Sequence, residues 1–357
     1  MEHEKELALF LKMLPNIQSL VVDGKAISDK TDPNQFDPEV ESMFVNAAKI
    51  INKANTLKEA TVTEEGTGAE PSRRKELGDS SHPLLQLQKL TITGYVKKCF
   101  KRMLSHPGLV TVHFAVDSDL LLAPLTVFES FPPRSLRHIQ CTYCHINMEK
   151  IRKFVSCASR LQSLIIIRLP FKSDTLEDTM NYHEIGESLR KVGKRLHKFH
   201  LVEYVLNDTS RNSYTGRVGS LVELRQLIEL EIDYVPFVVG SPKHENVERY
   251  PTILPLADVI PVSLERLVLY GCNDDKETFS EPFLRQDLLK LVCSKRTVNL
   301  QSVLVSPLSR QDGANDILEF DSTFAADLSE RGWGLKRTDD EYLLTRLHDA
   351  KSVAPAS

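Results

Sequence analysis

The densest pattern of reactive side chains in the chain is Cys141-Thr-Tyr-Cys144-His145. This C-x-x-C-H spacing is the one used for covalent c-type haem attachment, with the histidine as an axial iron ligand. Together with Cys157 it also supplies thiolate and imidazole groups of the kind that bind Zn²⁺. A metal-binding protein that uses Cys141, Cys144 and His145 is therefore one functional hypothesis.

A structural role explains Cys141 equally well. It is the last residue of LRHIQC (136–141), an alternating segment in which that position needs a small buried apolar side chain. Haem attachment requires export, and the N-terminal residues show no signal-peptide pattern. Cys157 falls on an apolar helical face, and no second C-x-x-C pair completes a zinc site. We therefore expect Cys141 to lie in the core, with no metal and no cofactor.

A second candidate is the acidic segment that contains Glu229, Glu231 and Asp233. Alternation with apolar residues predicts a strand with all three carboxylates on one wet face. Three carboxylates on one surface are typical ligands of a hard metal ion and typical acid–base groups. The acidic segment could therefore form a metal or catalytic site.

The neighbouring segments favour a different interpretation of these carboxylates. In a parallel, in-register ladder, Lys198 lies beside Glu229 and His200 beside Glu231, at about 4.8 Å between strands. On the other side Arg266 flanks Glu229 and Tyr270 flanks Asp233. Such a ladder is either a charge-compensated surface or a recognition patch, because Tyr and Arg are common in binding hot spots. We predict a protein-binding surface formed by Lys198, His200, Glu229, Glu231, Asp233, Arg266, Tyr270, His138 and Gln140.

The elements that must position these residues come from an internal repeat. The template apolar-x-x-apolar-x-apolar recurs ten times. The copies are IQSLVV (17–22), LKEATV (57–62), LQKLTI (87–92), LVTVHF (109–114), LRHIQC (136–141), LQSLII (161–166), LHKFHL (196–201), LIELEI (227–232), LERLVL (264–269) and LQSVLV (300–305). The third residue is polar in every copy, which predicts a short strand with one buried and one wet face.

Amphipathic helices are expected before several of these strands. Apolar residues recur at helical spacing in 43–51, 151–158, 185–196 and 283–292. Proline-containing turns, such as HPGLVTV (106–112), separate helix from strand because proline cannot prolong the helix. The basic run RKVGKRLHK (190–198) is expected to be the wet face of an outer helix.

Short strands that alternate with helices predict a parallel sheet with the helices on one side. Repeated in small units, this pattern predicts an α/β leucine-rich-repeat solenoid, with the strands on the concave face and the helices on the convex face. We assign residues 1–348 to a single solenoid, with a flexible insert at 64–82 and a C-terminal cap at 316–348. Residues 349–357 are expected to be a disordered tail.

The irregular repeats and the turn sequences LPNIQSL (14–20) and PPRSLRHI (132–139) resemble those of fungal F-box/leucine-rich-repeat proteins, over about residues 5–348. The resemblance implies that the repeats capture a substrate while an F-box docks the protein on a ubiquitin ligase. The first repeat strand begins at Ile17, which leaves no room for an F-box. A ligase role therefore requires an F-box encoded upstream or supplied by another chain.

Composition excludes several other functions. The 357 residues carry a net charge of −4, so the basic excess needed to bind nucleic acid or acidic membranes is missing. No apolar run reaches the roughly 18 residues of a membrane helix. The sequence shows no nucleophile beside a base and no glycine-rich phosphate loop, so we expect no enzyme activity. The prediction is a cytoplasmic or nuclear monomer that binds another protein through its concave face, with ubiquitin-ligase components as possible partners.

Overall fold

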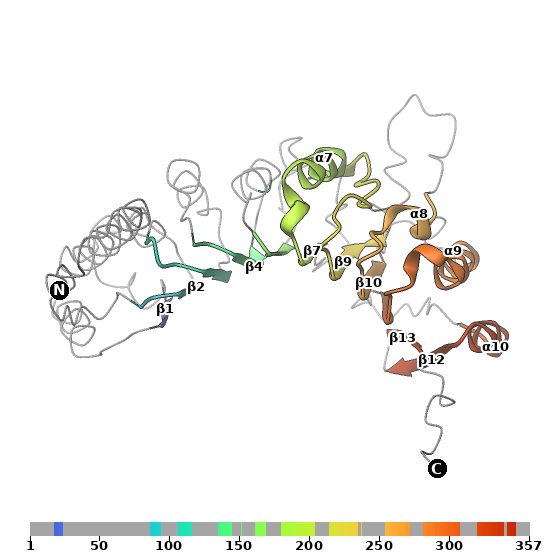
Figure 1. Cartoon of the computed structure of the whole chain (residues 1–357). Helices are drawn as coiled ribbons and strands as arrows, with labels where there is room; N and C mark the ends of the chain where they lie inside the picture. The colour runs from blue at the N-terminus through green and yellow to red at the C-terminus, as the bar shows by residue number, and fades with distance from the viewer. Residues whose placement is uncertain are drawn as a thin grey trace, which may run out of the picture. The chain divides into compact units, whose positions relative to one another are not determined.

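The computed structural model describes residues 18–23, 86–93, 106–115, 135–144, 151, 161–168, 180–203, 214–234, 237, 254–271, 281–307, 320–338 and 341–347. The chain divides into two units, Met1–Cys144 and His145–Ser357, and each is described separately. Both units contain parallel strands that run in chain order, and the described parts form a mixed α/β fold (Figure 1).

The described residues of the first unit include four parallel strands. They are β1 (Ser19–Asp23), β2 (Lys89–Thr93), β3 (Thr111–Ala115) and β4 (His138–Cys144), and each pairs with the next. The polar third residue of each repeat begins its strand, so these residues form one cross-strand row of Ser19, Lys89, Thr111 and His138.

The second unit contains a seven-stranded, mostly parallel sheet. Its parallel members are β5 (Ser163–Arg168), β7 (Lys198–Glu203), β9 (Glu229–Asp233), β10 (Arg266–Gly271) and β11 (Ser302–Pro307). A hairpin of β13 (Glu341–Arg346) and β12 (Trp333–Thr338) completes the sheet, because β13 pairs antiparallel with β11. The short strands β6 (Met180–Asn181) and β8 (Tyr214–Thr215) form a separate parallel pair.

Helices connect the strands of the second unit. They are α7 (Tyr182–Val192), α8 (Leu256–Val259), α9 (Glu281–Cys293) and α10 (Ser322–Glu330), with 3₁₀ turns η4 (Gly193–Arg195) and η6 (Lys295–Thr297). Figure 1 shows α7, α8 and α9 on one side of the strands. Side-chain caps begin two of them: Asn181 accepts from the Glu184 amide at 3.1 Å, and Asp321 accepts from the Phe324 amide at 2.8 Å.

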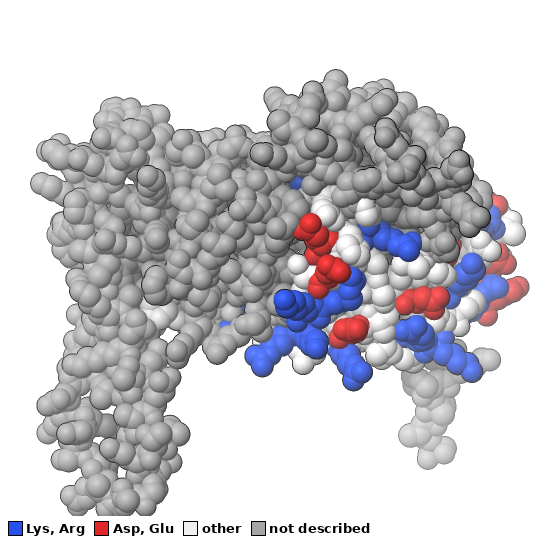
Figure 2. Space-filling view, turned by 90° about the horizontal axis from the view of Figure 1, so that it is seen from above, with Lys and Arg blue, Asp and Glu red and all other residues white. Residues whose placement is uncertain are grey.

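The helix-bearing side carries charges of both signs. Figure 2 shows Lys and Arg side chains interspersed with Asp and Glu on this side. Basic residues occupy the last turn of α7 and η4, where Lys191, Lys194 and Arg195 are exposed and complement the negative end of the helix dipole. The prediction that the basic run 190–198 is the wet face of a helix holds only for Lys191 on α7, because Lys194 and Arg195 lie in η4. Arg190 donates to the carbonyls of Val218 and Ser220, and Lys198 lies on β7.

One backbone interaction recurs between adjacent strands. The carbonyl just before a strand accepts two successive N–H groups at the start of the next strand. The Gln162 carbonyl accepts from His197 at 2.8 Å and from Lys198 at 3.0 Å. The carbonyls of Gln18, Gln88, Val110, His197, Ile228 and Glu265 do the same for the strands that follow them. The repeat therefore fixes the same register at each of these strand pairs.

The apolar template positions form the core. The first position of each copy from the third onward is a leucine that is at most 7% exposed: Leu87, Leu109, Leu136, Leu161, Leu196, Leu227, Leu264 and Leu300. The fourth and sixth positions, such as Leu230 and Ile232 on β9, are also buried. Burying one such side chain contributes about 1.5–3 kcal/mol, so the stacked rows supply much of the stability.

The structure confirms most of the expected elements. Nine of the ten template copies form strands, and the copy at 57–62 lies outside the described residues, as do the insert 64–82 and the tail 349–357. The helix expected at 185–196 lies earlier in the chain, because α7 begins at Tyr182 and ends at Val192, and the buried Leu196 follows η4. The described part of 316–348 is α10 followed by the β12–β13 hairpin.

No helix among the described residues has the length and apolar character needed to cross a membrane. The helices expected at 43–51 and 151–158 lie outside the described residues except for Ile151, which is helical and buried.

Replacing a leucine of the core row should destabilise the second unit far more than replacing its exposed neighbour. Leu227 is 0% exposed and Ile228 is 39% exposed. We expect Leu227→Ala to lower the free energy of unfolding by about 2–5 kcal/mol, because it leaves a cavity. Ile228→Ala should cost less than about 1 kcal/mol. Urea unfolding followed by circular dichroism measures both, and equal losses would contradict the assigned register.

Candidate functional site: a charged cluster on strands β7, β9 and β10

The predicted cross-strand neighbours are paired in the sheet. Lys198 pairs with Glu229 and His200 with Glu231, between β7 and β9. Arg266 pairs with Glu229 and Tyr270 with Asp233, between β10 and β9. These side chains lie on the face opposite the buried Leu230 and Ile232, which we call the polar face.

Five of these residues form what we call the charged cluster: Lys198, His200, Glu229, Glu231 and Arg266. One oxygen of Glu229, Oε1, lies 3.0 Å from Lys198 Nζ and 3.2 Å from His200 Nε2, and it also contacts Arg266 Nη1. Glu231 receives His200 Nδ1 on Oε2 and Arg266 Nη1 on Oε1, both at 3.0 Å. Each carboxylate is therefore held by His200 and Arg266 together.

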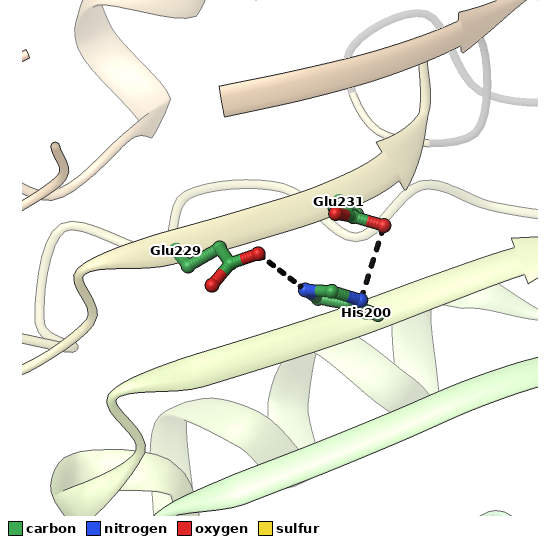
Figure 3. Close-up of side chains that lie close together, drawn as sticks. All are labelled: His200, Glu229 and Glu231. Atoms are coloured by element: carbon green, nitrogen blue, oxygen red, sulfur yellow. Dashed lines mark hydrogen bonds and ion pairs between the residues drawn. The ribbon is translucent and has the colours of Figure 1, made fainter. Parts of the chain in front are cut away.

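The imidazole of His200 lies between the two carboxylates, and each ring nitrogen faces one of them (Figure 3). The ring therefore links β7 to β9 through its contacts with both carboxylates.

Burial differs between the cations and the carboxylates of the cluster. The side chains are 45% exposed for Arg266, 34% for Lys198, 20% for Glu229, 12% for Glu231 and 7% for His200. The two long cationic side chains thus reach solvent, while the carboxylates and the imidazole lie beneath them. Such half-buried pairs are screened less by salt than surface pairs are.

Two expectations about exposure were wrong. His200 and Asp233 were predicted on a wet surface, but both are buried, and Asp233 is only 1% exposed. Alternation assigns a side chain to a face, whereas its accessibility depends on its neighbours on that face. Val202 and Val268 on the same face are buried as well, whereas Tyr270 is half-buried, so accessibility varies along this face.

The pKa values of Glu231 and of the neighbouring Tyr270 are both shifted from their ordinary values. Burial raises the pKa of Glu231, but the hydrogen bond and charge of His200, together with Arg266 and Lys198, outweigh it and hold the pKa below its ordinary value. Burial, helped by the negative charges of Glu231 and Glu341, raises the pKa of Tyr270 to about 12. The Tyr270 hydroxyl therefore remains protonated, and can donate a hydrogen bond, throughout the physiological range.

A buried carboxylate fixes the end of β9 to the helices. Asp287 of α9 accepts from the Tyr234 hydroxyl at 3.2 Å and from the Leu256 amide, at the start of α8, at 3.0 Å. Tyr234 directly follows Asp233, the last residue of β9. Burial raises the pKa of Asp287, although both hydrogen bonds oppose this shift. The network anchors the strand that carries both glutamates of the cluster.

Among the described residues, His200, Glu229 and Glu231 form the one group close enough to share a metal ion. Their oxygens, however, already receive Lys198 and Arg266, and the imidazole already faces both carboxylates. An added divalent cation would compete with these positive groups for the same donor atoms. The cluster is therefore a poor metal site, and its chemistry is that of ion pairing.

The other predicted site residues belong to the first unit. His138 and Gln140 lie on β4 and are half-buried, and Gln140 pairs with His113 of β3. His113 hydrogen-bonds Thr142 through Nε2 at 2.8 Å, and burial together with the charge of Lys89 lowers the pKa of His113. The structure thus divides the predicted surface into a charged part in the second unit and a largely neutral part in the first.

Cys141 is fully buried on β4, as expected for a core residue. The Cys144 side chain, His145 and Cys157 lie outside the described residues, so the predicted metal-binding alternative stays a prediction.

Sequence analysis missed two apolar residues beside the cluster. Leu304 of β11 pairs with Val268 of β10, and Leu343 of β13 pairs with Leu304, so both lie on the polar face. Both are half-buried. The outward position of Leu304 in LQSVLV could have revealed it, but the position of Leu343 depends on the antiparallel pairing of β13.

No protein-family model matches the chain, and the curated proteins include no significant match. The functional inference therefore depends on the geometry and charge of the cluster.

The ion pairs of Glu231 should make stability depend on pH. Because its folded-state pKa lies below the ordinary 4.5, its contribution is present above pH 4.5 and is lost as pH falls through the folded-state value. We expect Glu231→Gln to cost about 1–3 kcal/mol near pH 7. The cost should shrink below pH 4.5.

Urea titrations between pH 3 and pH 7 measure this difference. The matched control is Glu223→Gln, an exposed glutamate for which we expect little change at any pH. A cost of Glu231→Gln that stays constant over the whole range would contradict the ion-pair assignment.

Proposed function

We propose that the chain is a protein-binding leucine-rich-repeat module that captures its partner on the polar face of the second unit. Repeated strands with one register and helices on one side support the repeat architecture. In such architectures the strand face opposite the helices is the usual binding surface. The role of substrate receptor for a ubiquitin ligase stays a prediction, carried by the resemblance of the repeats.

The observation that carries the proposal is the preorganisation of Arg266 and Lys198. Both side chains reach solvent, and both are held from beneath by Glu229. Arg266 also contacts Glu231, so its guanidinium is fixed by two carboxylates. A side chain that is already ordered loses less conformational entropy when a partner binds, and this increases affinity. Arg and Tyr are also the residue types enriched in binding hot spots, and Tyr270 lies on the same face of β10 as Arg266, with Val268 between them.

A binding role fits the cluster better than catalysis. A general base needs a free lone pair, but both nitrogens of His200 face carboxylates. Within the described residues the cluster also contains no serine or cysteine hydroxyl or thiol placed beside His200 as a nucleophile. We therefore propose that the cluster recognises a partner and does not transform a substrate.

The double variant Arg266→Ala/Tyr270→Ala tests this function. Affinity capture from lysate with quantitative mass spectrometry should identify partners of the wild type whose recovery falls at least about tenfold with the variant. The matched control is Arg225→Ala, which removes an exposed arginine that lies outside the charged cluster. Its partner recovery should equal that of the wild type.

Circular dichroism and thermal melting establish that the double variant is folded. We expect a native spectrum, since Arg266 and Tyr270 lie on the polar face and not in the apolar rows. Unchanged recovery of every partner with a folded double variant would contradict the proposed site.

A further inference from the structure

The most accessible atoms of the charged cluster are hydrogen-bond donors. Arg266 and Lys198 are its two most exposed side chains, at 45% and 34%. A guanidinium has five N–H groups and an ammonium three, and neither accepts a hydrogen bond. The contacts to Glu229 and Glu231 involve only one guanidinium nitrogen, Nη1. The remaining donors of both side chains are directed to a ligand or to water.

Three of the four carboxylate oxygens of the cluster are already engaged. Glu229 Oε1 receives three cationic groups, and each oxygen of Glu231 receives one. The most exposed groups of the cluster are the cations Arg266 and Lys198, so a ligand with a negative group would pair with them, whereas a cationic ligand would be repelled.

Aliphatic side chains lie next to these donors. Leu304 is diagonal to Arg266 across β10 and β11, because Arg266 pairs with Ser302. Diagonal neighbours in a sheet are about 7–8 Å apart. Leu343 lies one strand further, at about 4.8 Å from Leu304 in the hydrogen-bonding direction. Both leucines are half-buried, so each leaves apolar surface open on the polar face.

We propose that the charged cluster and the adjacent Leu304 and Leu343 recognise an acidic–aliphatic peptide segment of the partner protein. An aspartate or glutamate of the partner pairs with Arg266 and Lys198. A leucine, isoleucine or valine about two to four residues away packs on Leu304 and Leu343, since an extended chain spans about 3.3 Å per residue. This inference rests on the proposed function, because it specifies the ligand of the same surface.

The surface favours a peptide over a nucleic acid. A phosphate backbone also offers acceptors, but nucleic-acid binding needs many cations along the strand and aromatic side chains for stacking. The polar face offers Arg266 and Lys198 beside aliphatic Leu304 and Leu343, and the whole chain carries a net charge of −4. An oligonucleotide is therefore a competing ligand for the experiment to exclude.

Selection of peptides from a random-sequence display library on the full chain tests the inference. Enriched peptides should carry Asp or Glu two to four residues from Leu, Ile or Val. A synthetic peptide of the enriched sequence should bind Arg266→Ala and Lys198→Ala at least about tenfold more weakly, and its affinity should fall with added salt. Leu304→Ser should remove the aliphatic preference and keep the acidic one.

Arg225→Ala is again the matched control, and it should leave the peptide affinity unchanged. Lys198→Ala keeps both carboxylates paired with Arg266 and His200, so it tests the inference even if Arg266→Ala does not fold. A melting curve of each variant establishes that it is folded.

The outcomes separate this inference from the proposed function. Enriched peptides that are neutral or basic, but that still need Arg266, would overturn the acidic–aliphatic ligand and leave the binding function standing. Tighter binding of a single-stranded oligonucleotide than of the enriched peptide, lost in Lys198→Ala, would also overturn it. Absence of any enriched peptide on the folded wild type would count against both.

Discussion

A backbone contact that recurs at the start of seven of the described parallel strands is the constraint on which the rest of the structure depends. One carbonyl accepts two successive N–H groups of the following strand, as Gln162 does from His197 and Lys198. This contact aligns the same template position in neighbouring strands. The leucines of the first position are then stacked in one buried row, and the polar third residues are stacked in another row on the opposite face.

The charged cluster is a direct consequence of that alignment. A register that pairs Lys198 with Glu229 and Glu229 with Arg266 leaves their side chains about one strand spacing apart. At this separation, unlike charges attract and like charges would oppose pairing of the strands. The same ion pairs that make the sheet compatible with these residues also hold Arg266 and Lys198 in place. One set of contacts therefore both compensates charge within the sheet and orders its two exposed cations.

The two units present different polar faces. On β3 and β4 of the first unit, the described polar side chains include His113 and Thr142, which bond to each other, and the lowered pKa of His113 favours a neutral ring. On β7, β9 and β10 of the second unit, ionised groups are paired over three strands. Among the described residues, the ion-paired charges of the polar face therefore belong to the second unit, where the Asp287 network ties the end of β9 to the helices.

The sequence by itself determined the strands, their polar first residues and the pairing of Lys198, Glu229 and Arg266. Apolar and polar residues alternate along each repeat, and only one strand register buries all of the apolar residues on the same face. It could not determine that His200 bridges both glutamates or that Asp233 is buried, because side-chain contacts and accessibility depend on residues distant in sequence. Leu343 likewise reaches the polar face only through the antiparallel pairing of β13 with β11, which follows no repeat. The tertiary structure thus decided which of the aligned charges reach solvent and which lie beneath them.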